Sequence, residues 1–174
     1  MSASEPLDIK NYIGLTGDTP IRFIASDVDG TLVNDAKSVD PEVVNAVRAA
    51  RESGIRVAIA SGRAWHEMDD VIESMPCLRY FVCTNGAYVM DKEEQKELVH
   101  ISFDKTRAID LVRKLMTYGV FVEAYVKAEI FGQYPVVGNE IAQAEHFFRP
   151  NIRPFILKTR TMVPNLLAHV ESLP

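Results

Sequence analysis

The hydrophobic and polar positions of this chain follow a regular pattern from residue 21 onward. Three short apolar runs, at residues 21–26, 56–60 and 80–83, each end in small or polar residues, which is typical of buried strands. Two segments between them, at residues 40–54 and 65–75, carry apolar residues at helical spacing. Strands that alternate with helices in this way predict an α/β fold with a parallel sheet and right-handed crossovers.

The ends of these helices carry the residues expected there. Asp40-Pro41-Glu42 offers an N-cap, a proline at the first helical position and an acid in the first turn. Gly54 suits the left-handed position that ends the first helix, and Pro76 stops the second. Before residue 21, apolar residues are scattered among polar ones, so we expect a loose N-terminal tail over residues 1–20.

After Gly86 the pattern changes to a mixture of short strands and helices. Two apolar runs, at 87–90 and 98–101, flank a charged turn and predict a hairpin. We expect three segments in all, namely a tail over 1–20, a core over 21–87 and an α+β unit over 88–174. The further elements predicted in the last segment are a helix over 104–118, strands over 120–126 and 129–134, a helix near 139–147, a strand over 155–159 and a helix from residue 164.

The composition is that of a folded globular protein, with 47% hydrophobic and 25% charged residues. A net charge of −5 with dispersed Lys and Arg argues against nucleic acid as a partner. No apolar run approaches the ~20 residues of a membrane span, and the first twenty residues do not resemble a signal peptide. Cys77 and Cys83 lack the spacing of a zinc site, and a buried, reduced Cys83 fits a cytoplasmic protein.

Two carboxylates follow the first predicted strand, in Asp27-Val28-Asp29-Gly30-Thr31-Leu32. Because side chains alternate along a strand, Asp27 and Asp29 should project the same way, and like charges this close favour a bound metal or a shared proton. One carboxylate could act as a nucleophile while its neighbour acts as general acid and base. The alternative is a pair of turn acids or a calcium loop. The EF-hand template fails, because Gly30 takes its fourth position and Ser38 its acidic twelfth.

The second and third predicted strands end in Ser61-Gly62-Arg63 and Asn85-Gly86. Ligands of open parallel sheets bind beyond the carboxyl ends of the strands, so we expect these residues to converge with the two aspartates. Ser61 suits both an N-cap and a donor to an anion, and Arg63 suits both a phosphate contact and an exposed position. Asn85-Gly86 is also a good turn pair without any further role. Packing or solvent exposure is the favoured interpretation of the scattered His66, His100, His146 and His169, of Trp65 and of Lys158.

These motifs resemble those of the haloacid dehalogenase superfamily, specifically its Cof-type phosphatases with a large α/β cap. Asp27–Leu32 matches the first motif, Ala60-Ser61-Gly62-Arg63 is similar to the second, and Thr84-Asn85-Gly86-Ala87 to the segment that leads into the cap. The resemblance implies a Rossmann-like core with an α+β cap. It also implies Mg²⁺-dependent hydrolysis of small phosphorylated metabolites, such as sugar phosphates.

The resemblance further implies a role for each residue of the motifs. Asp27 would be the nucleophile that forms an aspartyl-phosphate, and Asp29 the general acid and base. Mg²⁺ would be held by the Asp27 carboxylate and the Asp29 main-chain carbonyl. The residues expected to bind phosphate are Ser61, Gly62 and Gly30, and those expected to bind substrate are Asn85, Gly86 and Arg63.

The chain departs from the family pattern beyond the predicted cap. The family supplies a lysine and a Gly-Asp metal motif after the cap, but Gly17-Asp18 is the only Gly-Asp pair here and Lys158 falls within the cap. We therefore expect an incomplete core, with a chain that ends inside the cap at Pro174. An exposed sheet edge would then allow self-association or binding of a complementing chain. The alternative function is a non-catalytic remnant that binds a phosphorylated ligand or a partner chain.

Overall fold

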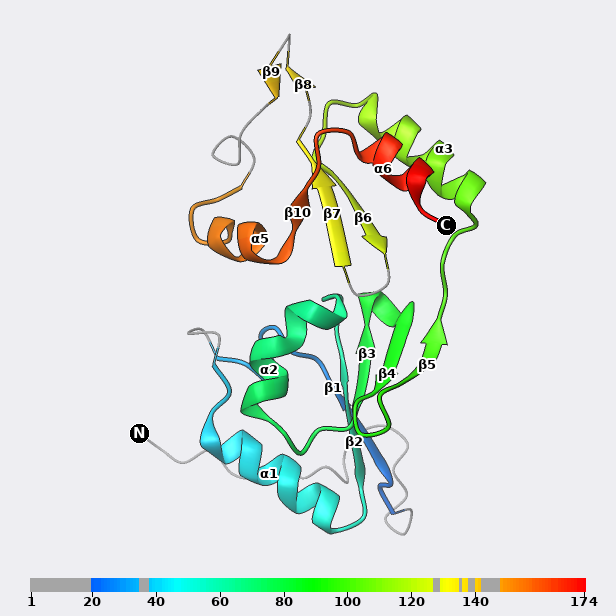
Figure 1. Cartoon of the computed structure of the whole chain (residues 1–174). Helices are drawn as coiled ribbons and strands as arrows, with labels where there is room; N and C mark the ends of the chain where they lie inside the picture. Colours follow the sequence, from blue (N-terminus) through cyan, green and yellow to red (C-terminus); the bar gives the residue numbers. More distant parts are fainter. Residues whose placement is uncertain (1–19, 35–37, 127–128, 135, 138–139, 142–147) are drawn as a thin grey trace.

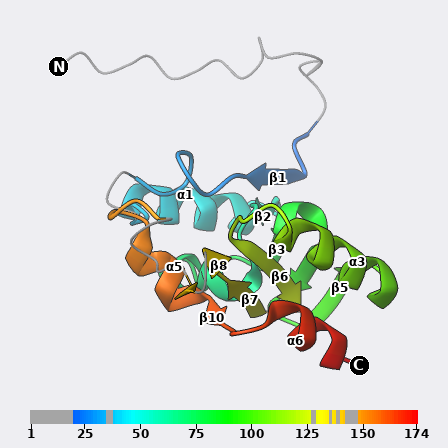
Figure 2. The same cartoon turned by 90° about the horizontal axis from the view of Figure 1, so that it is seen from above.

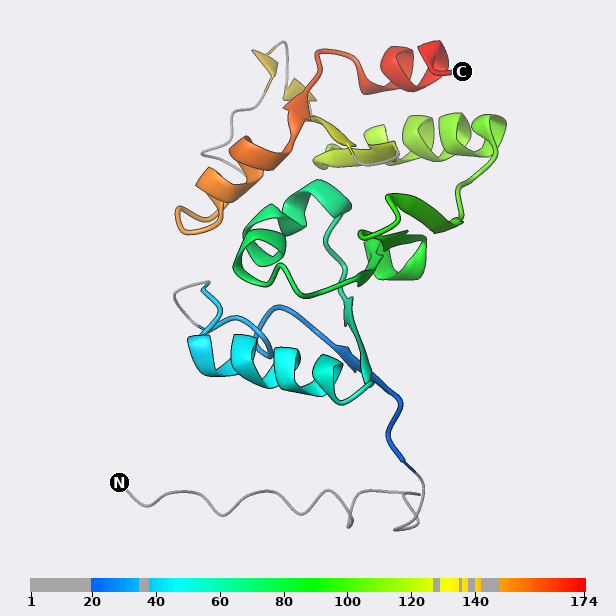
Figure 3. The same ribbon diagram turned by 60° about the horizontal axis from the view of Figure 1, so that its bottom comes forward.

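The computed structural model describes residues 20–34, 38–126, 129–134, 136–137, 140–141 and 148–174. These residues form two units, each built around its own β-sheet (Figure 1). The first unit carries strands β1–β5 with helices α1 and α2, and the second carries strands β6–β10 with helices α3, α5 and α6. The second unit stays stacked on the first when the molecule is turned (Figure 3). Residues 1–19 of the predicted tail lie outside the described residues.

The sheet of the first unit has five strands in the order β1-β2-β3-β4-β5. The pairs β1–β2 and β2–β3 are parallel, which confirms the predicted α/β arrangement, and the hairpin β4–β5 adds to β3 in antiparallel fashion. The predicted boundary between residues 87 and 88 therefore falls inside this sheet, and the division into core and cap stays a prediction. The strands are β1 (Phe23–Ser26), β2 (Arg56–Ala60), β3 (Tyr80–Cys83), β4 (Tyr88–Asp91) and β5 (Lys96–His100).

Both predicted crossover helices form and pack on the same side of this sheet (Figure 1). Helix α1 (Pro41–Glu52) joins β1 to β2, and a 3₁₀ turn (Trp65–Met68) followed by α2 (Asp69–Ser74) joins β2 to β3. Two right-handed crossovers that move in one direction along a sheet place their helices on one face. The fully buried core beneath them is apolar and includes Ile59, Met68, Val71, Met75, Leu78, Phe81 and Cys83.

Strand β1 forms where the sequence predicts it, but the predicted burial is wrong. Phe23 is 54% exposed and Ile24 is 38% exposed. The buried apolar cluster takes its strand residues from β2, β3 and β4 instead, and within the described residues β1 has a strand neighbour on one side only. Seen from above, β1 lies at one margin of the molecule, away from the second unit (Figure 2). An apolar run thus predicts a strand without fixing where in the sheet that strand lies.

The second unit has a three-stranded sheet in the order β10-β7-β6, with α3 and α6 packed together beside it. Val112, Val122, Leu166 and Val170 form its buried apolar cluster. Within the described ranges, no helix is both long and apolar enough to cross a membrane. The bounds are α3 (Lys105–Met116), β6 (Val122–Val126), β7 (Glu129–Gln133), β10 (Thr161–Met162) and α6 (Leu166–Ser172).

Two predictions in this unit need correction. The strand expected over residues 155–159 is a helix, α5 (Arg153–Thr159), with Pro154 in its first turn, where the fixed φ of proline favours a helix start. Five residues with no clear period cannot distinguish a strand from a helix. The helix expected near 139–147 is wrong where it can be compared, because β9 (Glu140–Ile141) pairs with β8 (Val136–Val137). The remainder of that prediction lies outside the described residues.

Candidate active site

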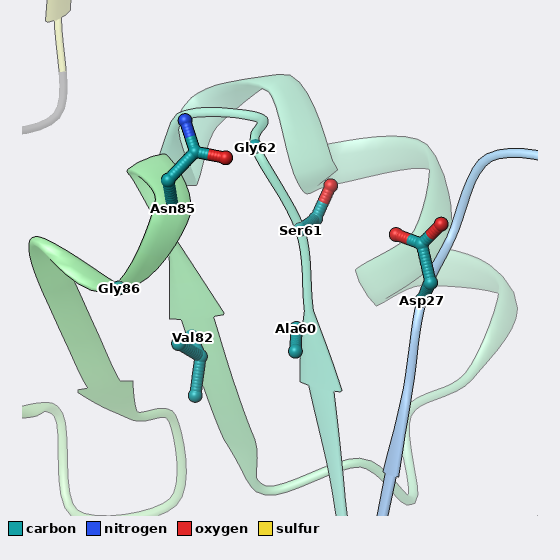
Figure 4. Close-up of a pocket in the computed structure, with 7 residues that line it drawn as sticks. All are labelled: Asp27, Ala60, Ser61, Gly62, Val82, Asn85 and Gly86. Carbon is teal, nitrogen blue, oxygen red and sulfur yellow. The ribbon is translucent and has the colours of Figure 1, made fainter.

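The three parallel strands end at the same edge of the first sheet, and each is followed by predicted site residues. Together these residues form a cavity of about 390 Å³ (Figure 4). The structure therefore brings the three motifs together, whereas the role of each residue stays a prediction. The residues that line the cavity are Asp27, Ala60, Ser61, Gly62, Val82, Asn85 and Gly86.

Asp27 supplies the carboxylate of this cavity, on the same side as the Ser61 hydroxyl (Figure 4). The next residue, Val28, is fully buried, and its carbonyl accepts hydrogen bonds from the N–H groups of Leu32 (3.0 Å) and Val33 (3.1 Å). This tight turn explains Gly30, which has a φ of 77°. Gly30 does not line the cavity, and its expected part in phosphate binding stays a prediction.

Ser61 is 8% exposed and holds the end of β2 against β3. Its N–H donates to the Val82 carbonyl at 2.9 Å, and its hydroxyl oxygen accepts from the Arg63 N–H at 3.2 Å. The N-cap of the following 3₁₀ turn is Ala64, so Ser61 is not the helix cap that the sequence allowed. Because the hydroxyl accepts within its own loop, its proton can be donated to an anion in the cavity.

The Thr84–Gly86 turn forms the opposite wall of the cavity in a strained conformation. Thr84 and Asn85 have positive φ angles of 51° and 54°, a region that β-branched residues rarely enter. The Thr84 N–H donates to the Arg63 carbonyl at 2.9 Å, and the Asn85 N–H donates to the Ser61 carbonyl at 3.2 Å. These two bonds tie the turn to the Ser61–Arg63 loop, so Asn85-Gly86 is more than a connection between strands.

Gly62 lies where the two loops approach most closely. A Cβ atom placed on Gly62 would lie 3.1 Å from Oδ1 of Asn85, closer than most contacts of real Cβ atoms. A side chain at position 62 would therefore displace Asn85 toward the cavity or away from it. The close approach of the two loops explains a glycine in the middle of Ser61-Gly62-Arg63.

Asp29 is held by Arg63 rather than lying in the cavity. The Arg63 Nε and Nη2 groups donate to its two carboxylate oxygens at 2.8 Å each, and Nη1 also donates to Asp70 at 3.4 Å. The hydrogen bond that Arg63 donates to Asp29 raises the pKa of Arg63 above its ordinary value, although partial burial acts against it. Arg63 is therefore a partner of the second aspartate in this structure, and it does not line the cavity where substrate contact was expected.

The donors present fit a metal ion that keeps part of its water shell. Among the described residues, no three His, Cys, Asp or Glu side chains gather as a ready-made metal cluster. Asp27 offers a carboxylate at the cavity, whereas both carboxylate oxygens of Asp29 accept from Arg63. Mg²⁺ is commonly bound through one or two carboxylates plus waters and substrate phosphate, so the carboxylate of Asp27 suits it.

The residues that the sequence assigned to packing or solvent lie outside the cavity, as far as the structure describes them. The Trp65 ring meets Phe81 edge to face at 5.3 Å, as expected for a core anchor. Cys83 is fully buried, and burial raises the pKa of its thiol to about 12. Lys158 is exposed on α5. His146 lies outside the described residues.

Sequence reasoning missed Glu67 and Arg160, which join the two units in the structure. Glu67 is buried, and one of its carboxylate oxygens accepts from the Ala64 N–H at 2.7 Å. A capping box has Ser or Thr at the N-cap and Glu or Gln three residues later, but the N-cap here is Ala64, so the sequence offered only the Glu67 half of that signature. Nothing in the local sequence connects it to Arg160, because 93 residues separate the two.

Comparison with known proteins agrees with this arrangement. The model of the haloacid dehalogenase-like hydrolases matches residues 24–172. Phosphatase YwpJ of Bacillus subtilis (strain 168) is 31% identical over 125 residues, which cover 72% of this chain and 43% of that protein. Pyridoxal phosphate phosphatase YbhA of Escherichia coli (strain K12) is 26% identical over 114 residues, covering 66% of this chain and 42% of that protein.

Solved structures show the same fold. A haloacid dehalogenase-like hydrolase from B. subtilis superimposes with a TM-score of 0.69 at 23% identity, over 88% of this chain and 58% of that one. A sugar phosphatase of the superfamily's subclass IIB gives a TM-score of 0.67 at 16% identity, over 87% and 55% of the two chains.

The fold is an open α/β sheet, and an aspartate lines the cavity at the edge where its parallel strands end. The chain belongs to the haloacid dehalogenase-like hydrolase family. It spans about half the length of the relatives that it matches.

Proposed function

We propose that this chain carries the nucleophile of a phosphatase that acts on small phosphorylated metabolites. The observation that supports the proposal most directly is the cavity in which the Asp27 carboxylate faces the Ser61–Gly62 loop and the Asn85 turn. Relatives whose names describe them as phosphatases, among them the pyridoxal phosphate phosphatase YbhA, support the same reaction class. A volume of about 390 Å³ suits a phosphoryl group with a small leaving group.

In the proposed reaction, a carboxylate oxygen of Asp27 attacks phosphorus while the bond from phosphorus to the leaving oxygen breaks. Asp29 gives its proton to the leaving oxygen, and the alcohol departs from an aspartyl-phosphate. Asp29 then takes a proton from a water molecule whose oxygen attacks phosphorus, so that phosphate leaves and the Asp27 carboxylate is restored. The Ser61 hydroxyl would donate to a phosphoryl oxygen throughout.

Asp27 and the Asp29 main-chain carbonyl would hold Mg²⁺, which supplies positive charge to the phosphoryl oxygens when bound. Arg63 restricts what Asp29 can do, because both of its carboxylate oxygens accept from the guanidinium group. Donation of a proton by Asp29 therefore requires that its carboxylate already carries a proton, which the cycle supplies from the water of the preceding turnover, and that at least one of these bonds gives way.

Replacement of Asp27 tests the assignment of the nucleophile. We expect D27N to lower the turnover of p-nitrophenyl phosphate by about 10³-fold or more in the presence of Mg²⁺, because the amide cannot form the covalent intermediate. D110N is the matched control, since Asp110 lies exposed on α3 in the other unit. Chelation of the metal should abolish turnover by the wild type. Equal turnover by D27N and the wild type would reject Asp27 as nucleophile.

A second candidate function is binding without turnover, to a phosphorylated ligand or to a partner chain through β1. The exposed apolar side chains of Phe23 and Ile24 on a strand with one neighbour in the described sheet favour it. A rise in melting temperature with inorganic phosphate, together with no turnover above the D27N background, would support this candidate.

Cys77 and Cys83 are both free, which fits the proposed location in the cytoplasm.

A further inference from the structure

Glu67 and Arg160 form a buried ion pair between the two units. The Glu67 side chain is 3% exposed and that of Arg160 is 8% exposed. Arg160 follows α5 and also donates from Nε to Glu123 of β6 at 2.8 Å. Among the described residues, this is the only ion pair that joins the first unit to the second. Separation of a buried ion pair would leave an uncompensated charge in the interior. The two side chains therefore keep a fixed position relative to each other.

Two further contacts surround this pair. The His66 ring nitrogen Nε2 lies 2.7 Å from the Thr159 carbonyl. The centroid of the Phe155 ring of α5 lies 5.5 Å from the guanidinium carbon of Arg63 and 5.6 Å from that of Arg160. The segment from Phe155 to Arg160 therefore meets the first unit at the loop that follows Gly62, which itself lines the cavity.

The same contacts lead to Asp29. Arg63 lies against Phe155 while it donates to both carboxylate oxygens of Asp29. Its Nη1 group also donates to the main-chain carbonyl of Glu67 at 3.2 Å. Glu67 thus contacts this loop twice, because its carbonyl accepts from Arg63 and its carboxylate accepts from the N–H of the next residue, Ala64. The guanidinium group of Arg63 therefore contacts both α5 and the carboxylate of Asp29.

We propose that Arg160 and Glu67 are positioning residues, which dock the Phe155–Arg160 segment onto the Ser61–Glu67 loop and thereby orient Arg63 and Asp29. With the segment docked, Phe155 confines the Arg63 side chain and limits the positions that Asp29 can take. With the segment released, Arg63 loses that contact and the Asp29 carboxylate loses its defined orientation. This inference deepens the proposed function and rests on it wherever proton transfer by Asp29 is concerned.

The first test is hydrogen–deuterium exchange of the whole chain, which does not depend on turnover. R160M keeps the length of the side chain and removes its charge, and R113M is the matched control on exposed α3. We expect R160M to exchange several-fold faster over residues 61–70 and 153–162, with α1 unchanged. R160K, which can still pair with Glu67, should restore part of the protection. Exchange in R160M equal to that in R113M would overturn the proposal.

The second test separates positioning of Asp29 from general damage. Glycerol phosphate has a poor leaving group that needs a proton, whereas p-nitrophenolate leaves without one. We expect R160M to lower kcat/KM for glycerol phosphate by about tenfold or more and that for p-nitrophenyl phosphate by less than about threefold, because kcat/KM reports the steps up to departure of the leaving group and not the later hydrolysis that both substrates share. Equal losses on both substrates would overturn the coupling to Asp29.

A double variant covers the case in which R160M does not fold. E67Q/R160M removes both charges of the pair, while the amide oxygen introduced at position 67 can still accept from the Ala64 N–H. The same exchange and leaving-group pattern is expected in it. If the wild type turned over neither substrate, the proposed function would fail, and the exchange comparison alone would decide whether Arg160 docks the two units.

Discussion

Thr84 and Asn85 hold two consecutive positive φ angles at the wall of the cavity. Conformations of this kind cost about 1–3 kcal/mol per residue and persist only where the surroundings impose them. Here the surroundings are visible, since both N–H groups donate to carbonyls of the Ser61–Arg63 loop. The strain is therefore balanced by contacts between the two loops that form the candidate site.

Removal of the side chain at this turn should stabilise the fold. We expect T84G to raise the free energy of unfolding by about 1 kcal/mol, because glycine adopts positive φ without steric cost. T117G is the control, since Thr117 has a φ of −70° after α3 and should lose about 0.5–1 kcal/mol on the same change. Urea denaturation measures both. A loss of stability in T84G as large as that in T117G would contradict the argument.

The residues of the cavity could be predicted because one geometric rule covers them. Asp27, Ser61 and Asn85 each follow a strand, and parallel strands end at one edge. The partner of Asp29 could not be predicted in the same way, because Arg63 had equally good uses as a phosphate contact or an exposed residue. Arg63 pairs with Asp29 because the fold brings their two loops close together. The local sequence pattern carries no information on that distance.

At the scale of whole elements, two helices begin at an aspartate but use it differently. Asp104 caps α3, with its carboxylate accepting from the Arg107 N–H at 2.9 Å. Asp40 occupies the predicted N-cap position of α1 but makes no capping bond, and its carboxylate accepts from Asn34 at 2.9 Å instead. A sequence rule predicts the position of such a residue better than the bond that it makes.

The difference should appear in stability. We expect D104A to lower the free energy of unfolding by about 1 kcal/mol, the usual cost of losing an N-cap bond, and D40A to lower it by less than half as much. D104N should retain most of the stability, because an amide oxygen can also accept from the N–H of Arg107. Thermal and urea unfolding of the three variants provide the comparison. Equal losses in D40A and D104A would show that capping does not distinguish the two helices.

Elements with a clear period were predicted well, and short apolar runs were not. Helix α3 has apolar side chains at regular helical spacing over three turns, which fixed both its type and its approximate bounds. Helix α5 has seven residues, and its apolar run fits a strand equally well until Pro154 is given weight. Strand β1 was placed correctly along the chain, but its exposure depends on which strands lie beside it.

At the scale of the whole molecule, β1 presents exposed apolar side chains and a free edge among the described residues. We propose that two copies of the chain pair through this edge, because exposed edge strands readily add another strand. F23K should lower the fraction of dimer, since it places a charge in the edge. The control is F103K, at a position that is 61% exposed between the two units. Light scattering over a range of concentrations measures the mass, and a wild type that stays monomeric throughout would reject the pairing.

The order of strands in the first sheet also bears on how the chain reaches this structure. Strands β3, β4 and β5 are joined by short turns and pair with their neighbours in sequence, so we expect them to pair early during folding. Strand β1 finds β2 only after the closure of a loop of about thirty residues, which is slower. The segment that bears Asp27 would then be the last to assemble, and the candidate site would form only after the rest of the sheet.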